Sequence, residues 1–294
     1  MMTRRDALKL SAAGVAVLAL PAHASGALDW TFYQADEAGF LRTPVLLSGE
    51  TDAILIDGGF TLSDGRAVAD AIKATGKRLT TIYVTCNDPD YYFSLRPIVD
   101  AFPDAQVIAR PDTVAAINGN VEGKLAVWGP QLGDNGPQTL ADVVVPAASE
   151  ATSLELEGQT IEIVEFPDMH DRRYLWVPSL QAVFGGVLVY SGIHVWVADN
   201  ATPESRAQWI AALDEIIARN PAIVVPGHQA PGAAQGIPAV RFTRDYLQAF
   251  DKAAETAANS EELIAAMKAQ FPDLGSESSL ELGAKVAKGE MQWG

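Results

Sequence analysis

The sequence predicts an α/β fold built from two successive halves, each with β-strands followed by α-helices. Short apolar runs rich in β-branched residues, which favour buried strands, alternate with longer runs that repeat at helical spacing. This order of strands and then helices occurs twice along the chain, which is typical of a layered α/β domain. Polar residues with metal-binding side chains follow several strand ends, and open α/β sheets place ligands at such ends.

The first half opens with a short predicted strand and a hairpin, whose two apolar strands flank the turn Gly49-Glu50-Thr51-Asp52. An amphipathic helix follows and ends at Gly76, a residue type that commonly terminates helices. Residues 129–137, which contain three glycines and two prolines, are predicted to be an irregular loop. The predicted strands are 30–33, the hairpin 45–56, 81–85 and 106–109, and the predicted helices are 63–75, 94–102 and a weakly periodic run from 111 to 128.

The second half repeats the order of strands and helices. Its hairpin turns at Glu157-Gly158 and alternates apolar with polar residues, as a half-buried hairpin does. Thr202 is the predicted N-cap of an amphipathic helix. The predicted strands are 143–145, 153–164, 174–178, 182–190 and 222–228, and further helices are predicted from 239 to 271 and from Ser279 onward.

The strand at 81–85 leads into a polar loop, Cys86-Asn87-Asp88-Pro89-Asp90-Tyr91. The loop resembles the signature loop of the metallo-β-lactamase fold superfamily, Thr-His-x-His-x-Asp-His. Cys86, Asp88 and Tyr91 fall on the three His positions, and Asp90 keeps the Asp. The loop is more similar to a subgroup that reads His-Gly-Asp-Pro-Asp-Tyr-Tyr-Phe-Gly, although Cys86 still replaces a His. The resemblance implies a four-layer αβ/βα sandwich of the metallo-β-lactamase type over residues 25–294.

Three further segments resemble motifs of this family. Ile56-Asp57-Gly58 resembles its Asp-x-Gly motif, which implies that Asp57 orients a ligand or loop amides; an Asx turn that closes the strand is the alternative. Pro226-Gly227-His228 matches the last motif and makes His228 a candidate metal ligand. His194 begins a segment similar to His-x-Trp-x-Ala-Asp of some subgroups, so it either lies beside the cleft or belongs to the core.

Two positions depart from the family pattern. Met169 falls on the histidine of a Pro-Gly-His-Thr segment that completes the first metal site, and His170 is one residue away from it. A one-residue adjustment of the loop would bring His170 to that position. Val187 stands where the family has an Asp that bridges two metals. We therefore expect at most one tightly bound Zn²⁺, held by His228 with some of Cys86, Asp88, Asp90 and His170.

The resemblance implies a metal-dependent hydrolase, which would open an ester, lactone, thioester or amide of a small-molecule substrate by metal-hydroxide attack. Asp90 would act as ligand and base that orients the hydroxide, and Tyr91 could donate a hydrogen bond to an oxyanion. Two alternatives are open. One is a non-catalytic relative that binds a small molecule or a protein partner. The other is a thiol-based or redox role of Cys86, which lacks a second cysteine nearby.

Composition and charge narrow the classes of function. The chain has 294 residues, of which 48% are hydrophobic, enough for a large core and too many for a disordered chain. The formal net charge of −16 argues against nucleic acid or an anionic membrane as a partner, because phosphate binding needs clustered Lys and Arg. Cys86 is the single cysteine, so no disulfide can form within the chain.

Residues 1–24 are predicted to be a signal peptide. Thr3-Arg4-Arg5-Asp6-Ala7-Leu8-Lys9 resembles the twin-arginine export signal, and Ala22-His23-Ala24 is an Ala-x-Ala cleavage site. The apolar run 10–20 is too short to span a bilayer, which takes about 20 residues. We therefore expect a periplasmic protein with no membrane attachment after cleavage; an uncleaved membrane anchor is the alternative.

Replacing Arg4 and Arg5 with lysine should leave the precursor in the cytoplasm, because the twin-arginine route is addressed by the arginine pair. Cell fractionation followed by immunoblotting measures this. Normal export of the double variant, with cleavage after Ala24, would contradict the prediction.

Overall fold

The computed structural model describes residues 27–169 and 171–293, which are organised around two β-sheets. In the first sheet six strands lie side by side in sequence order. Strands β1 to β3 are antiparallel, and β3 to β6 are parallel. These strands are β1 (Asp29–Phe32), β2 (Val45–Ser48), β3 (Asp52–Ile56), β4 (Arg78–Val84), β5 (Gln106–Ala109) and β6 (Ala147–Ala148).

The second sheet contains five strands in the order β12-β10-β9-β8-β7. Its neighbours are antiparallel except for β10 and β12, which are parallel. A separate parallel pair consists of β11 (Tyr190–Ser191) and β13 (His228–Gln229). The strands of the second sheet are β7 (Ser153–Leu156), β8 (Gln159–Glu165), β9 (Arg173–Val177), β10 (Ala182–Phe184) and β12 (Ile223–Val224).

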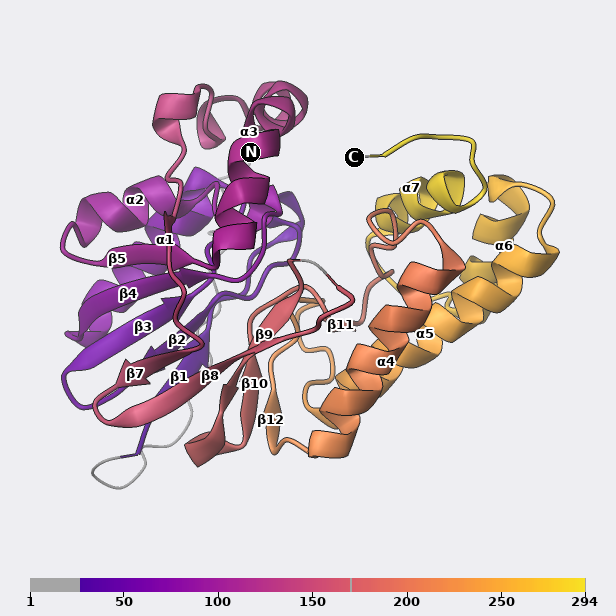
Figure 1. Ribbon diagram of the computed structural model, residues 1–294. Helices are drawn as coiled ribbons and strands as arrows, with labels where there is room; N and C mark the ends of the chain where they lie inside the picture. Colours follow the sequence, from indigo (N-terminus) through magenta and orange to yellow (C-terminus); the bar gives the residue numbers. More distant parts are fainter. Residues whose placement is uncertain (1–26, 170, 294) are drawn as a thin grey trace, which may run out of the picture.

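Helices cover the outer side of each sheet, so the molecule has four layers (Figure 1). Apolar side chains of the two sheets meet between them, among them Phe32 and Ile54 from the first sheet and Leu175 and Phe184 from the second. The first sheet carries α1 (Leu62–Thr75), α2 (Leu95–Ala101) and α3 (Pro111–Leu132), and the second carries α4 (Pro203–Arg219) and α5 (Ile237–Thr256), followed by α6 (Ser260–Gln270) and α7 (Glu277–Ala287). This arrangement confirms the predicted four-layer αβ/βα sandwich.

The helix that begins at Pro111 is longer than the sequence predicts, because it continues through Pro130 to Leu132. The side chain of Gln138 explains its extended end. Its Nε2 atom donates to the carbonyl of Gly129 at 3.1 Å and to that of Gly133 at 2.6 Å. A side chain that binds carbonyls at a helix C-terminus stabilises that end, and this contact comes from outside the helix.

The predicted strand 182–190 is divided into β10 and β11, which belong to different sheets. Gly185 and Gly186 separate them with φ angles of +73° and +75°. These angles take the chain out of the extended conformation, and glycine adopts them without steric cost. The predicted strand 222–228 is divided in the same way, into β12 and β13.

Two other boundaries differ from the prediction. Residues 143–145 form no strand, and the strand of this region is β6, which pairs with β5. The predicted helix 239–271 is interrupted at Asn259, whose side chain accepts a hydrogen bond from the N–H of Glu262 at 2.9 Å. Asn259 is thereby the N-cap of α6, and a cap of this kind starts a new helix.

The signal peptide predicted for residues 1–24 lies outside the described residues. Among the helices of 27–169 and 171–293, none is both long and apolar enough to cross a membrane.

Gly186→Ala should lower the free energy of unfolding by more than about 3 kcal/mol, because its Cβ would collide with a backbone atom that cannot move aside. An added Cβ would lie 2.0 Å from the carbonyl oxygen of Arg173. Gly158→Ala is the matched control: its φ is +78°, and no atom lies within 4 Å of the added Cβ. The control should lose only about 1 kcal/mol. Equal losses in urea denaturation would contradict the prediction.

Candidate functional site

The site forms where the carboxyl ends of β3 and β4 meet the turn before β13. Asp57 directly follows β3, and Asp90 lies in the loop after β4. His228 is the first residue of β13. Arg42 lies in the segment before β2 and forms an isolated antiparallel bridge with His228, which brings its side chain into the same junction.

Arg42 is the central cation of this junction, although its side chain is only 1% exposed. Its guanidinium carbon lies 3.4 Å from the centroid of the Tyr91 ring. Nη2 lies 3.6 Å from Oδ2 of Asp57, and Nε lies 3.6 Å from Oδ2 of Asp90. Nε also donates to the backbone carbonyl of Asp90 at 3.1 Å, and Nη1 donates to the carbonyl of Gly227. Burial of the charge is tolerated because carboxylates, carbonyls and an aromatic face surround it.

Asp57 holds the loop that follows β4. Its Oδ1 accepts a hydrogen bond from the N–H of Thr85 at 2.7 Å, and the Thr85 hydroxyl donates to both carboxylate oxygens. The N–H of Gly186 donates to Oδ2 at 3.3 Å. Burial raises the pKa of Asp57, while Arg42 opposes the rise. These contacts orient backbone amides at the site, which is the kind of role that the Asp-x-Gly resemblance implies.

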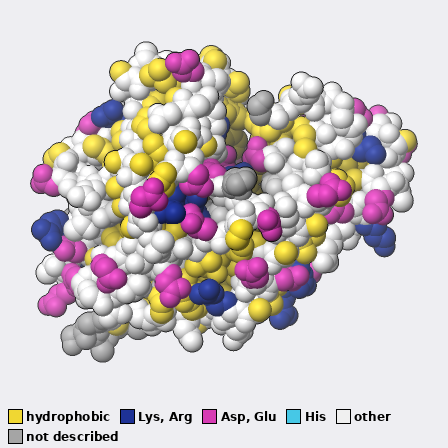
Figure 2. All heavy atoms as spheres, in the orientation of Figure 1, with side chains coloured by type: hydrophobic (Ala, Val, Ile, Leu, Met, Phe, Trp, Pro, Cys, Tyr) yellow, Lys and Arg dark blue, Asp and Glu magenta, His cyan; other side chains and the backbone are white. Residues whose placement is uncertain are grey.

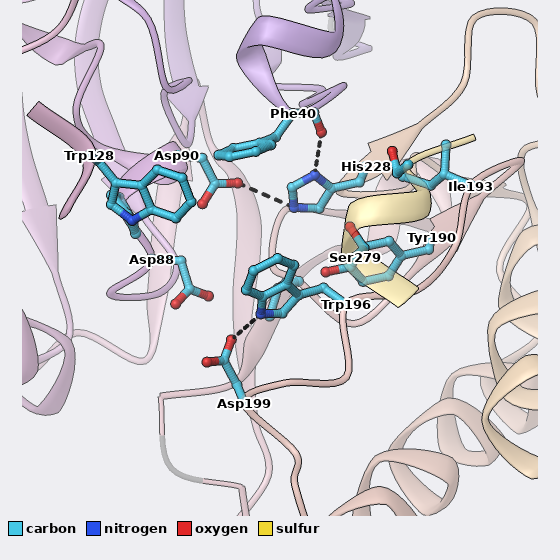
Figure 3. A pocket seen from close by; sticks show the side chains of 13 residues that line it. Phe40, Asp88, Asp90, Trp128, Tyr190, Ile193, Trp196, Asp199, His228 and Ser279 are labelled. Carbon is cyan, nitrogen blue, oxygen red and sulfur yellow. Dashed lines mark hydrogen bonds and ion pairs between the residues drawn. The ribbon is translucent and has the colours of Figure 1, made fainter. Parts of the chain in front are cut away.

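Asp90 and His228 face each other across the junction (Figure 3). Nε2 of His228 lies 3.3 Å from Oδ2 of Asp90, and Nδ1 lies 2.7 Å from the carbonyl oxygen of Phe40. A carbonyl can only accept, so Nδ1 carries the ring proton. Burial and the nearby Arg42 lower the pKa of His228 to about 3, which leaves Nε2 as an acceptor. Burial raises the pKa of Asp90 to about 7, so its carboxyl group can hold a proton for Nε2. Such a pair can exchange a proton with a bound molecule.

Cys86 and Asp88 lie beside two further cations. Sγ of Cys86 is 3.6 Å from Oδ2 of Asp88. Burial raises the pKa of the Cys86 thiol, which therefore keeps its proton. The Asp88 carboxylate lies 3.8 Å from Nζ of Lys124 and 3.6 Å from Nη1 of Arg172. Burial opposes ionisation of Asp88, but Arg172 and Lys124 outweigh it and lower its pKa. The charge of Asp88 is therefore balanced by the protein itself.

The described residues do not fit a zinc site. Within 27–169 and 171–293, no three His, Cys, Asp or Glu side chains are arranged to hold a metal ion together, and a protein zinc site takes about three or four such ligands. The structure brings Asp90 and His228 together, but Arg42 beside Asp90 repels a second cation. A ligating cysteine is a thiolate, and burial of Cys86 raises the pKa of its thiol. His170 lies outside the described residues.

Two other candidates from the sequence lie away from the open part of the site. Tyr91 is buried beneath Arg42, and its hydroxyl has no hydrogen-bond partner among the described residues. Tyr91 therefore supports Arg42. His194 is 1% exposed, and its Nδ1 lies 2.9 Å from the hydroxyl of Tyr246 on α5. Burial lowers the pKa of His194, so it is a neutral histidine of the core.

A cavity of about 600 Å³, including the part open to solvent, borders Asp90 and His228. In Figure 2 a hollow separates the part of the molecule that carries α3 from the part that carries α6 and α7. Val187, which stands at the bridging position of the family pattern, contributes an apolar side chain to the lining. The cavity has aromatic walls, which consist of Phe40, Trp128, Tyr190 and Trp196.

Comparison with known proteins identifies the family. The sequence model of the metallo-beta-lactamase superfamily matches residues 39–228, which is more than half of the chain. The chain belongs to the metallo-β-lactamase superfamily. This confirms the family recognised from the loop at 86–91, and membership of the superfamily suggests a metal-dependent hydrolase. No curated protein sequence matches the chain.

Solved metallo-β-lactamase structures share the fold at low sequence identity. The metallo-beta-lactamase from Pontibacter korlensis is 18% identical with a TM-score of 0.54, and the match covers 80% of this chain and 99% of that chain. A crystal structure of the DIM-1 metallo-beta-lactamase is 14% identical with a TM-score of 0.53, and the match covers 80% of this chain and 97% of that chain. Identity this low shows a common fold and does not transfer an activity.

Sequence reasoning missed the two arginines that balance the site. Arg42 stands between Leu41 and Thr43, just before the buried strand β2. A lone arginine in such an apolar stretch is a signal, because arginine is rarely buried unless it is paired. Arg172 follows Asp171 directly, and such a charged pair beside the loop at 166–171 is a second signal of this kind. Neither spacing nor periodicity indicates which carboxylates these arginines contact.

Arg42→Met should lower the free energy of unfolding by about 3–5 kcal/mol, because Asp57 and Asp90 would lose a buried cationic partner. Arg78→Met is the control: Arg78 pairs with Asp52 at 2.7 Å, but its side chain is 74% exposed. An exposed pair contributes about 0–1 kcal/mol. Urea denaturation followed by circular dichroism measures both. Similar losses in the two variants would show that the buried carboxylates do not depend on Arg42.

Proposed function

We propose that this metallo-β-lactamase-fold protein binds a small organic molecule in the cavity beside Asp90 and His228, and that the buried guanidinium of Arg42 balances the charge of Asp90 in place of a metal ion. The contact between Arg42 and Asp90 carries this proposal. Nε of Arg42 lies 3.6 Å from the carboxylate and hydrogen-bonds the backbone carbonyl of the same residue. A fixed cation therefore already stands beside Asp90, the position of the signature loop that keeps the family residue.

Electrostatics support binding of an organic molecule over binding of a metal ion. A divalent metal at Asp90 and His228 would lie close to a buried guanidinium, where low polarity strengthens the repulsion between like charges. Asp88, the neighbouring acidic position, is balanced by Lys124 and Arg172. The cavity beside these residues combines aromatic walls with polar side chains, three of which are carboxylates, and sites for small molecules likewise combine apolar walls with a limited number of polar groups.

A metal-dependent hydrolase is the second candidate. Superfamily membership favours it, and so does the pair of Asp90 and His228 at the cavity wall, which can accept or deliver a proton during hydrolysis. Such an enzyme would open an ester, lactone, thioester or amide. The cations beside Asp88 and Asp90 disfavour this candidate, because they already balance the carboxylates that would bind the metal.

Wild-type protein purified without a His tag, incubated with zinc and then dialysed, should retain far less than one equivalent of the metal. Elemental analysis measures this, and His228→Ala and Cys86→His are assayed in parallel. We expect no difference between wild type and His228→Ala. Cys86→His brings a better ligand to the loop, but Arg42 remains in place, so we expect occupancy to stay below one equivalent.

Stoichiometric zinc in the wild type, lost in His228→Ala and raised by Cys86→His, would favour the hydrolase instead. Loss of hydrolytic activity on treatment with a chelator would then identify the metal as part of the reaction. Zinc that persists in His228→Ala would be bound elsewhere on this acidic surface.

A further inference from the structure

The charged side chains that line the cavity are all carboxylates within the described part of the chain. They belong to Asp88, Asp90 and Asp199. The other titratable side chains of the lining are those of His228 and Tyr190. No lysine or arginine of the described residues reaches the cavity surface. A molecule that enters the cavity therefore meets the carboxylates directly, whereas their cationic partners lie behind the cavity surface.

The cations that balance these carboxylates approach from behind the wall. Nζ of Lys124 lies 3.8 Å from Asp88, and Nη2 of Arg172 lies 3.7 Å from Asp199. Both distances exceed those of hydrogen bonds, which are about 2.7–3.2 Å for nitrogen donors. The carboxylates therefore keep free acceptor positions. Asp199 is also oriented at the mouth by the indole N–H groups of Trp196 and Trp293, each at 3.0 Å.

The hydroxyl of Tyr190 is a second, independent sign of a ligand. Tyr190 is only 3% exposed, and its ring stacks on His228 with a centroid distance of 5.0 Å and an interplanar angle of 7°. No hydrogen-bond partner of its hydroxyl is found among the described residues. Figure 3 shows the ring reaching into the cavity from the side of His228. The hydroxyl of so deeply buried a tyrosine usually has a partner, and a molecule bound in the cavity would provide one.

The aromatic rings that line the cavity can also bind a positively charged ligand. Trp128, Trp196 and Phe40 stand around the carboxylates in Figure 3. The face of an aromatic ring attracts cations, and tryptophan is the strongest of the natural rings. Anions are disfavoured by the carboxylates and by the net charge of −16. Because the aromatic faces and the carboxylates are spread around the cavity, it suits a larger cation recognised by several groups at once.

We propose that the ligand is an organic cation, an ammonium group on a small, partly apolar body, whose charged group binds against Trp196 and Asp199. This inference rests on the proposed function and specifies its ligand. The two inferences concern different parts of the site: Arg42 lies beside Asp90 and disfavours a metal ion there, and the organic cation binds at Trp196 and Asp199.

The first experiment compares choline with 3,3-dimethylbutan-1-ol, a neutral molecule of nearly the same shape. Both are titrated into the full chain and followed by tryptophan fluorescence, which reports on Trp128 and Trp196, and by calorimetry. Choline should bind about tenfold more tightly than the neutral molecule, since only the cation gains from the aromatic faces and the carboxylate. Its affinity should fall as salt is added.

Variants test the residues that make the site. Trp196→Leu should weaken choline binding about fivefold or more, and Trp196→Phe, which keeps an aromatic face, should retain most of it. Asp199→Asn should also weaken binding. Asp214→Asn is the control, because Asp214 on α4 pairs with Arg244 at the surface and does not line the cavity. Circular dichroism confirms that each variant is folded.

A fragment screen separates the small-molecule proposal from the organic-cation inference. The set contains cationic, neutral and anionic fragments. Binding is followed by ligand-observed NMR with choline as competitor and by chemical shifts of the protein. Cationic fragments should predominate among those that shift cavity residues. Neutral or anionic fragments that bind there while cations do not would overturn the organic-cation inference and leave the proposed function standing. Absence of any fragment from the cavity would overturn both.

Discussion

The buried guanidinium of Arg42 holds together four segments that are far apart in the sequence. It joins its own segment before β2 to Asp57 at the end of β3, to the loop of Asp90 and Tyr91 after β4, and to the carbonyl of Gly227 before β13. A buried charge is tolerated only when partners surround it on all sides. The geometry of the site is therefore fixed by one side chain.

The same interaction changes the chemistry that the fold can support. The metallo-β-lactamase architecture brings strand-end residues together at one edge, and here the acidic residues among them face arginine and lysine. Positive charge is built into the chain at this edge. Asp90 and His228 keep a proton-exchanging pair at the cavity wall, while the residues above them form aromatic and acidic walls. Fold and function are separable in this way because function depends on the few side chains at the site.

Local patterns predicted much of the fold. The hairpin at 45–56, the strand at 106–109 and the helix that ends at Gly76 depend on alternation, helical spacing and turn residues, which are properties of neighbours in the sequence. The misplaced boundaries depend on distant contacts. Gln138 stabilises the end of α3 from another segment, and Gly186 leaves the sheet where the backbone of Arg173 comes too close for any side chain.

By itself, the sequence determined the family, the layered fold and the motifs that contain Asp57, Asp90 and His228, because a loop motif and local periodicity suffice for these. Only the tertiary structure decided that Arg42 stands beside Asp90, that Tyr91 lies beneath it and that His194 belongs to the core. The physical reason is that the state of a charged group is set by burial and by the partners around it. Those partners come from segments whose approach no local pattern encodes.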